Sequence, residues 1–334
     1  MRPQQRRKLG YAILAVMMMT CFWGFSSGAL AQEKEEVAYR LKWFFNVSVV
    51  GDLWADFHGN FAQNGLEVTV KTGGPERDAI KELELGRAQF GVASADQVIR
   101  AVSKGARIVV LAQLFQTNPL HWIYRPDKSP FKNPADFKGQ TVGITYGQND
   151  ETIMRALLAK FNVKEDELKL FSVHRDYTPF YQGKVHFWPL YINSQAPIIG
   201  DKLKKAGESF SFMSPDDFGI RFVANSVLTS RQMVESRPDT VKRFMTALLQ
   251  GWREALDPVN NERAIKTILE FDKETPEVLI RRQLPVTRKL MMPTADFPFG
   301  KIDVEAWKQT EEIMLSQKLI PAPVHVEKLL MPMK

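Results

Sequence analysis

Two patterns of apolar residues alternate along most of the chain. Short runs of β-branched and aromatic residues predict strands, and segments whose apolar residues recur every three or four positions predict amphipathic helices. The expected strands are residues 39–45, 66–70, 90–93, 108–112, 141–145, 168–173, 185–191 and 221–228. The expected helices include residues 53–63, 75–85, 151–161, 194–206 and 236–256. This alternation is typical of an α/β fold in which helices cover both faces of a sheet.

The clearest helix follows Ser236. The sequence Ser236-Arg237-Pro238-Asp239 resembles a capping box with an acidic residue in the first turn. Apolar residues then follow helical spacing without a gap, at Val241, Phe244, Met245, Leu248, Leu249, Trp252 and Leu256. Asp257-Pro258 ends the helix, because the residue before a proline disfavours the helical conformation. We expect the apolar side chains of this helix to lie in the core.

The first 31 residues have a different pattern, which is typical of an export signal. Four basic residues lie within the first eight positions, residues 9–25 are almost wholly apolar, and small residues end the segment at Ala31. We therefore expect residues 1–31 to be a cleaved signal peptide and the protein to be periplasmic. One alternative is a membrane anchor that stays attached. The other is lipid attachment at Cys21, which Thr20 disfavours because a small residue is needed there.

The positive charge of the chain is concentrated in this first segment. The whole sequence has 334 residues, with 45 Lys and Arg against 38 Asp and Glu, which gives a net charge of +7. Residues 1–31 carry four of the positive charges and no negative charge, so the remainder has a net charge of +3. We expect no nucleic-acid partner, because no later cluster of Lys and Arg is interleaved with aromatic residues.

The motifs of common enzymes and metal sites are missing from the sequence. The single cysteine rules out a disulfide framework, and the five histidines lack the spacing typical of metal ligands. There is no G-x-S-x-G motif, phosphate-binding loop or G-x-G-x-x-G motif. We therefore expect a protein without catalytic activity, bound metal or cofactor. A Ser/His/Asp triad stays open, because its members need not be adjacent in sequence.

A series of short motifs follows in collinear order over roughly residues 37–275. The motifs are Leu41-Lys42-Trp43-Phe44-Phe45-Asn46, Gln63-Asn64-Gly65-Leu66-Glu67-Val68, Gly73-Gly74-Pro75, residues 85–92, residues 137–143, residues 183–191, Asp217-Phe218-Gly219-Ile220 and the helix from Pro238. In this order they resemble the NMT1/THI5-like (ThiY/SsuA-like) periplasmic substrate-binding proteins of ABC transporters. The collinear series is more specific than any one of its motifs.

The resemblance implies a two-lobed α/β protein with the type 2 fold of periplasmic binding proteins. This fold has two mixed sheets flanked by helices, with a ligand cleft between them. Lobe 1 would comprise residues 37–125 and 226–300, lobe 2 residues 126–225, and a C-terminal helical extension residues 301–334. The resemblance also implies a monomer that delivers a small-molecule ligand to an ABC permease at the inner membrane. The alternatives are an extracytoplasmic sensing subunit and a THI5-like pyrimidine-forming enzyme.

Four loops that follow expected strands, together with the Asp217 segment, form the candidate ligand site. Ligands of open α/β sheets bind beyond the carboxyl ends of the strands, and the resemblance implies the same loops. The candidate binding residues are Trp43, Asn46, Ser94, Asp96, Gln148, Asn149, Trp188, Tyr191, Asn193 and Asp217. Aromatic rings would stack on a flat ligand, while amides and carboxylates would bind its edge. The same residues also fit roles as helix caps, turn residues or core residues. Trp188 and Tyr191 should face opposite sides of their strand.

Three departures from the family pattern bear on the ligand. Val49 stands where pyrimidine-binding members carry a histidine, Phe45 replaces a proline, and Gln195 replaces a glutamate. They weaken the implied case for an aminopyrimidine precursor of thiamin. A neutral or anionic solute, such as a sulfonate, a carboxylate or another heterocycle, gains weight. The ligand expected overall is a small planar or anionic organic molecule.

Overall fold

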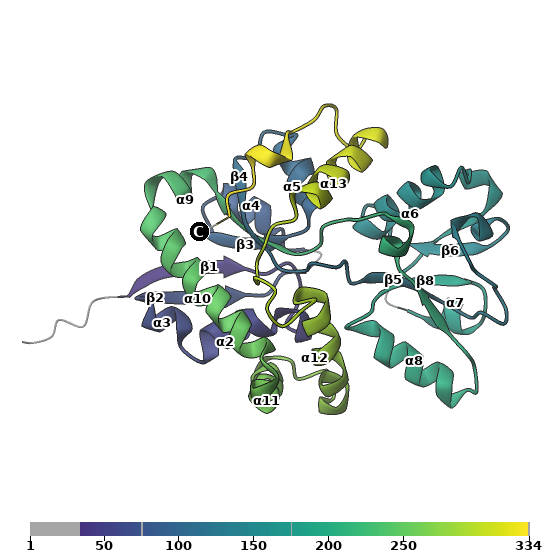
Figure 1. The fold of residues 1–334 in the computed structure, drawn as a ribbon, viewed down its shortest axis with the longest axis horizontal. Helices are drawn as coiled ribbons and strands as arrows, with labels where there is room; N and C mark the ends of the chain where they lie inside the picture. The colour runs from purple at the N-terminus through teal and green to yellow at the C-terminus, as the bar shows by residue number, and fades with distance from the viewer. Residues whose placement is uncertain (1–33, 75, 175, 333–334) are drawn as a thin grey trace, which may run out of the picture. The chain divides into compact units, whose positions relative to one another are not determined.

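Two five-stranded sheets form the framework of residues 35–334 (Figure 1). The computed structural model describes residues 34–74, 76–174 and 176–332. The expected signal peptide, residues 1–31, lies outside the described residues. Within the described part of the chain, no helix is both long enough and apolar enough to cross a membrane.

The first sheet has the strand order β2-β1-β3-β10-β4. Its strands are β1 (Glu35–Arg40), β2 (Leu66–Lys71), β3 (Phe90–Ala93), β4 (Ile108–Gln113) and β10 (Ser226–Ser230). β1 pairs in parallel with β2 and β3, with Tyr39 opposite Phe90. β10 lies antiparallel between β3 and β4. The sheet is therefore mixed, and one of its central strands comes from much later in the sequence.

Helices cover both faces of the first sheet (Figure 1). One face carries α2 (Val50–Phe57), α3 (Asn60–Gln63), α10 (Pro238–Leu256), α11 (Asn261–Phe271) and α12 (Glu277–Met291). The other face carries α4 (Ala79–Glu84), α5 (Ala95–Val102) and α13 (Val304–Ser316). Strand residues alternate between the two apolar clusters, as a sheet covered on both faces requires: Val92 faces the α10 side and Ala93 the α5 side.

The second sheet has the strand order β7-β6-β8-β5-β9. Its strands are β5 (Leu120–Tyr124), β6 (Thr141–Ile144), β7 (Lys169–Ser172), β8 (Phe187–Tyr191) and β9 (Ser211–Met213). β6 is parallel to β7 and β8, whereas β5 is antiparallel to β8 and β9. Its helices are α6 (Asn149–Lys160) on one face and α7 (Thr178–Tyr181) and α8 (Gln195–Lys205) on the other. The expectation of two mixed sheets flanked by helices is confirmed.

The chain crosses between the sheets twice, after β4 and before β10. The two crossing segments lie side by side, because the Leu114 amide donates to the Asn225 carbonyl at 2.9 Å. The first crossing ends at β5, which belongs to the second sheet. The change of sheet therefore comes a few residues before the lobe boundary expected after residue 125.

The remaining elements are short and connect the larger ones. They are α9 (Arg231–Ser236) and the 3-10 helices η1 (Val47–Val49), η2 (Pro134–Phe137), η3 (Glu165–Glu167), η4 (Pro215–Phe218), η5 (Pro258–Asn260) and η6 (Val326–Lys328). Of these, η1 and η4 begin in loops that carry candidate site residues.

The helix α10 forms the core of the first sheet as its periodicity predicts. Phe244 stacks on Phe90 with ring centroids 3.6 Å apart, and Trp252 is fully buried. A Cβ at Gly51 of α2 would lie 2.0 Å from the Trp252 ring, so the crossing of α2 and α10 requires glycine there. The capping box expected at Ser236 is wrong, because this residue ends α9 and its hydroxyl donates to the Gln232 carbonyl.

Two element boundaries differ from the expectation for local reasons. The strand expected at residues 39–45 begins and ends earlier, as β1 (Glu35–Arg40). The chain leaves the sheet after Leu41, because the carbonyls of Lys42 and Trp43 accept hydrogen bonds from the amides of Gly74 and Gly73. The helix expected at residues 53–63 divides into α2 and α3 at Gly59, whose φ of +78° is left-handed.

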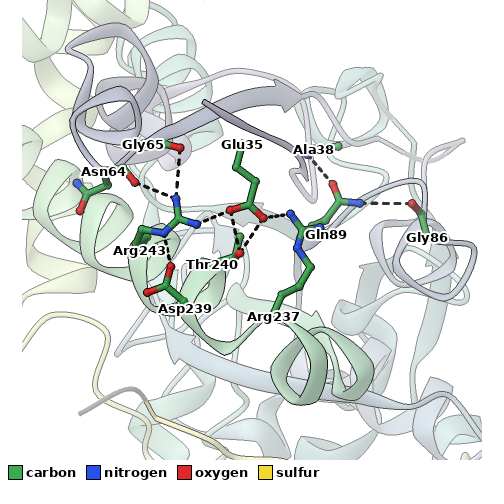
Figure 2. A network of polar contacts seen from close by, with 10 residues as sticks. All are labelled: Glu35, Ala38, Asn64, Gly65, Gly86, Gln89, Arg237, Asp239, Thr240 and Arg243. Carbon is green, nitrogen blue, oxygen red and sulfur yellow. Dashed lines mark hydrogen bonds and ion pairs between the residues drawn. The ribbon is translucent and has the colours of Figure 1, made fainter. Parts of the chain in front are cut away.

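A carboxylate anchors the start of β1 to α10 (Figure 2). Glu35 receives hydrogen bonds from Arg237, Thr240 and Arg243, and the Thr240 hydroxyl is 2.8 Å from the carboxylate. Burial alone would raise the pKa of Glu35, but these three donors lower it to about 2. Arg243 also donates to the Gly65 carbonyl, so it joins the start of β2 to the same helix.

Candidate functional site

The carboxyl ends of the parallel strands place the candidate loops at one edge of each sheet. In the first sheet these loops follow β1 and β3, and in the second they follow β6 and β8. The loops after β1 and β8 touch, because the Asn193 amide donates to the Ser48 hydroxyl at 2.9 Å. The two edges therefore meet in the structure at this point.

Trp43 is the most exposed aromatic candidate, with 43% of its surface accessible. Its loop is fixed from behind, because the Trp43 carbonyl accepts from the Gly73 amide at 2.9 Å. A Cβ at Gly73 would lie 2.2 Å from the Leu41 carbonyl oxygen, so only glycine allows this close approach. The indole is thus presented by a firmly held loop, where it makes an edge contact with Phe44, and its accessible part is suited to stacking.

Asn46 uses its amide within its own loop. Its Oδ1 atom accepts from the Ser48 amide at 2.7 Å and caps η1, while its Nδ2 atom donates to the Phe44 carbonyl at 3.1 Å. The turn role is therefore observed for Asn46. Direct contact between this side chain and a ligand stays a prediction.

Ser94 and Asp96 are buried and bonded to each other after β3. The Ser94 hydroxyl donates to the Asp96 carboxylate at 2.5 Å, and the Ser94 amide donates to the Gln97 side chain. The Ala95 amide, at the start of α5, donates to the Val223 carbonyl of the second crossing segment. This helix start is therefore occupied by the capping box and by the chain itself, which leaves less of it for an anion.

The loop after β6 is held by two carboxylates. Asp150 accepts from the Thr145 amide at 2.6 Å, and Glu151 accepts from the Gly147 amide at 2.7 Å. Burial raises the pKa of Asp150 to about 6 despite these hydrogen bonds. Gln148 is exposed, and the Nδ2 atom of Asn149 is buried with no partner among the described residues.

The expectation that Trp188 faces a ligand is wrong. This residue is 1% exposed, and its ring packs against Tyr177 and Phe180 in the core between the second sheet and α7 and α8. Tyr191 is half-buried on the opposite face of β8, as strand alternation predicts. The Tyr191 amide donates to the Gln195 side chain at 2.8 Å. Gln195, which stands in place of the family's glutamate, therefore stabilises the turn after β8.

Asn193 is fully buried at the meeting point of the two edges. Its Nδ2 atom donates to the hydroxyls of Ser48 and of Thr287, which lies on α12, at 2.9 and 3.0 Å. Its Oδ1 atom has no partner among the described residues. Sequence reasoning missed Ser48 and Thr287, and no motif marks either residue.

Asp217 is exposed on η4, next to Asp216, whose carboxyl is more deeply buried. Burial raises the pKa of Asp216 to about 6, and the Asp217 charge adds to this effect while Arg221 opposes it. His121 lies within electrostatic range of Asp217, but burial dominates and lowers the pKa of this imidazole. The edge of the second sheet thus carries several acidic groups.

Comparison with known proteins decides the family. The family model described as NMT1/THI5 like matches residues 46–260, which is more than half of the chain. The chain belongs to the NMT1/THI5-like family. The resemblance predicted from the motif series is thereby confirmed.

Two relatives of this NMT1/THI5-like chain are named as binding proteins. It is 24% identical over 322 residues to the formylaminopyrimidine-binding protein of Halalkalibacterium halodurans, and the match covers 94% of this chain and 95% of that protein. It is 22% identical to the riboflavin-binding protein RibY of Chloroflexus aurantiacus, over 88% of this chain and 84% of that one. The fold matches the periplasmic aliphatic sulphonate binding protein SsuA of Escherichia coli with a TM-score of 0.71 and 16% identity, over 90% and 93% of the two chains.

The described part of this NMT1/THI5-like chain contains no group of three His, Cys, Asp or Glu residues arranged to hold a metal ion. Two of the cavities that its described residues form have volumes of about 480 and 220 Å³. Leu83, Arg107 and Met233 line the larger one, and Arg221 and Glu305 the smaller. Neither is lined by a candidate site residue, so the ligand cleft between the lobes stays a prediction.

Proposed function

We propose that this protein is the extracytoplasmic solute-binding component of an ABC importer. It would capture a small planar organic solute between the facing loops of its two sheets and deliver it to an ABC permease at the inner membrane. Membership in the NMT1/THI5-like family and relatives named as binding proteins support this role. The predicted export signal supports a periplasmic receptor.

The meeting of the loops after β1 and β8 carries the proposal. Trp43 presents an accessible ring on the first loop, and half-buried Tyr191 precedes the contact on the second. The Asn193–Ser48 hydrogen bond brings these loops together although they belong to different sheets. Two aromatic side chains, one on the loop after β1 and one at the end of β8, are suited to hold a flat ring by offset stacking.

The charges around these loops favour an uncharged planar ligand over an anion. Asp96, Asp150 and Asp217 lie in the first turns of α5, α6 and η4, each close after the end of a strand, and the start of α5 is already occupied. Carboxylates repel a sulfonate or carboxylate ligand, whereas they accept hydrogen bonds from ring or exocyclic N–H groups. Two relatives are named for formylaminopyrimidine and riboflavin, which are ring compounds with N–H donors.

A thermal-shift series tests the proposal directly. Riboflavin, a formylated aminopyrimidine and an alkanesulfonate are added to the protein at increasing concentration. A ligand present at 100 times its Kd should stabilise the fold by about 2.7 kcal/mol. We expect a ring compound to raise the melting temperature and the sulfonate to have no effect. Stabilisation by the sulfonate alone would contradict the assigned ligand class, and turnover of a bound compound would contradict the binding role.

Trp43→Ala tests the assigned ring contact. We expect this variant to lose about 5- to 150-fold in affinity for the stabilising ring compound, because base-like rings gain about 1–3 kcal/mol from stacking on an aromatic side chain. Phe57→Ala is the matched control. Phe57 is also an exposed aromatic residue, but it is the last residue of α2, which packs on the first sheet, and it lies away from the strand ends. Equal losses in isothermal titration for the two variants would remove Trp43 from the site.

A further inference from the structure

A buried polar cluster joins the two sheets at the candidate site. We call it the Asn193 cluster, and its members are Asn193, Ser48 and Thr287. All three are less than a tenth exposed, and they come from the loop after β8, from η1 and from α12. The cluster therefore connects one element of the second sheet to two elements packed on the first.

One face of α12 follows the boundary between the two sheets. Gln283, Thr287 and Leu290 have the i, i+4, i+7 spacing of a single helix face. The Gln283 side chain donates to the Ser194 carbonyl at 2.8 Å, and the Leu290 carbonyl accepts from the Gln116 amide of the first crossing segment at 2.9 Å. Figure 1 shows the same helix opposite α8, and an exposed Arg282–Asp201 ion pair joins the two helices.

The cluster also links the two aromatic sides of the site. Asn46 caps the turn in which the Ser48 amide lies, and the Ser48 hydroxyl accepts from Asn193. Asn193 is two residues from Tyr191, and Asn46 is three residues from Trp43. One amide group therefore couples the loop of Trp43 to the loop of Tyr191.

We propose that Asn193 is a positioning residue that sets the equilibrium between joined and separated sheet edges through Ser48 and Thr287. Its amide acts on the loops that carry the rings, so the cluster would control ligand affinity without touching the ligand. The effect on affinity rests on the proposed function, whereas the effect on the separation of the two sheets does not. A ligand that needs both loops binds more weakly when the joined state is less populated.

The composition of the cluster makes this contact reversible. It is held by two hydrogen bonds to hydroxyls, and the buried Oδ1 atom of Asn193 is unpaired among the described residues. A hydrogen bond between neutral groups contributes only about 1 kcal/mol, because hydrogen bonds to water replace it when the edges separate. The joined state is therefore only modestly favoured, as a protein that must admit and release a ligand requires.

The test measures the distance between the sheets without any ligand. Spin labels are attached at Val259→Cys on η5 and Ile198→Cys on α8, which are both exposed and lie on different sheets. Cys21, the only cysteine in the sequence, lies in the predicted signal peptide, and the labelled protein begins after Ala31 so that the labels are unique. Pulsed electron–electron double resonance then gives the distribution of distances between the two spin labels, for the parent and for a Ser48→Ala/Thr287→Val double variant.

We expect the double variant to raise the ratio of separated to joined molecules by about tenfold, since each lost hydrogen bond contributes a few-fold. Thr267→Val is the matched control. Thr267 is also a buried helical threonine that donates to the carbonyl four residues earlier. Its second partner is His58 at the end of α2, so both partners lie in helices packed on the first sheet. This control should leave the distance distribution unchanged.

Three outcomes would overturn the inference. They are an unchanged distribution in a double variant that still unfolds cooperatively, an equal shift in the Thr267→Val control, and a shift to shorter distances. If a ring compound binds the parent, its affinity should fall in the double variant by the same factor as the joined population. If no tested compound binds, the proposed function fails, while the distance measurement still decides the role of the cluster.

Discussion

Two buried polar clusters in this protein share a layout, a central side chain with two hydrogen-bond partners, but have different surroundings. In the first, which we call the Asp52 cluster, Asp52 accepts from the Tyr39 hydroxyl at 2.8 Å and from the Trp252 indole at 3.1 Å. In the Asn193 cluster, one amide donates to two hydroxyls at similar distances. Each central side chain keeps one buried oxygen unpaired among the described residues.

The difference lies in what surrounds each cluster. The Asp52 cluster is enclosed by α2, α10 and the first sheet, where Gly51 and Trp252 leave no space for movement. The Asn193 cluster lies between elements of two sheets, and the described part of the chain crosses from one sheet to the other at two segments. A buried polar group in a rigid core changes the free energy of unfolding. The same kind of group between two bodies changes how often they separate.

The largest expected effect is a pH dependence that comes from Asp52. Burial raises the pKa of this carboxyl to about 7 in spite of the hydrogen bonds from Tyr39 and Trp252. The folded state then holds a proton that the unfolded state, with a pKa of 3.8, has released. The contribution of Asp52 to stability is therefore present below pH 4 and is lost as the pH rises from about 4 to 7.

Asp52→Asn should remove this dependence. At about 1.4 kcal/mol per pKa unit, the stability of the parent relative to the variant should fall by up to about 4 kcal/mol between pH 4 and pH 8. Urea unfolding at several pH values measures this difference, and taking it between the two proteins cancels the titration of Asp150 and Asp216. A difference that is constant with pH would mean that Asp52 stays ionised in the fold.

An intermediate effect is expected from two tryptophans that differ in one hydrogen bond. Trp252 and Trp307 are both fully buried, but the Trp252 indole donates to Asp52 while the Trp307 indole has no partner among the described residues. At pH 8, Trp252→Phe should therefore cost about 2 kcal/mol more than Trp307→Phe, the usual contribution of a hydrogen bond to a charged group.

The same pair can be measured at pH 5, where Asp52 is protonated. The extra cost of Trp252→Phe should become smaller, because a neutral carboxyl is a weaker acceptor than a carboxylate. Chemical denaturation monitored by circular dichroism gives both values. An extra cost that grows on acidification would show that ring packing, and not the hydrogen bond, separates the two sites.

The sequence predicted the core around the Asp52 cluster better than the junction between the two sheets. The α10 stripe is local, so periodicity alone identified Phe244 and Trp252 as core residues. The partners of Asn193 are 145 and 94 residues away in sequence, and no local pattern specifies such contacts. The helix α12 was not predicted either, because Pro285 lies within it and a proline normally ends a helix.

The candidate site shows the same limit. Alternation along β8 predicts that Trp188 and Tyr191 lie on opposite faces, and this is confirmed. It does not predict which face is covered, and the packing of α7 and α8 buries Trp188. The exposure of Trp43 depends on the approach of Gly73 from the end of β2, which is again a contact between distant residues.

The smallest expected effect is on stability in the Asn193 cluster. Thr287→Val and Thr267→Val each remove one hydroxyl that bonds to its own helix and to one other side chain. Each should lower the free energy of unfolding by about 1 kcal/mol, and the two losses should agree within about 0.5 kcal/mol. Parallel denaturation of the two variants measures this agreement.

Equal losses of stability would sharpen the contrast with the Asp52 cluster. Two threonines with matched burial and bonding would then contribute equally to the fold, while only Thr287→Val is expected to contribute to a change in the distance between the sheets. If Thr287→Val instead costs well over 1 kcal/mol more than Thr267→Val, the joined edges are part of the cooperative core. The Asn193 cluster would then resemble the Asp52 cluster in its surroundings as well as in its layout, and the sheets would separate only on unfolding.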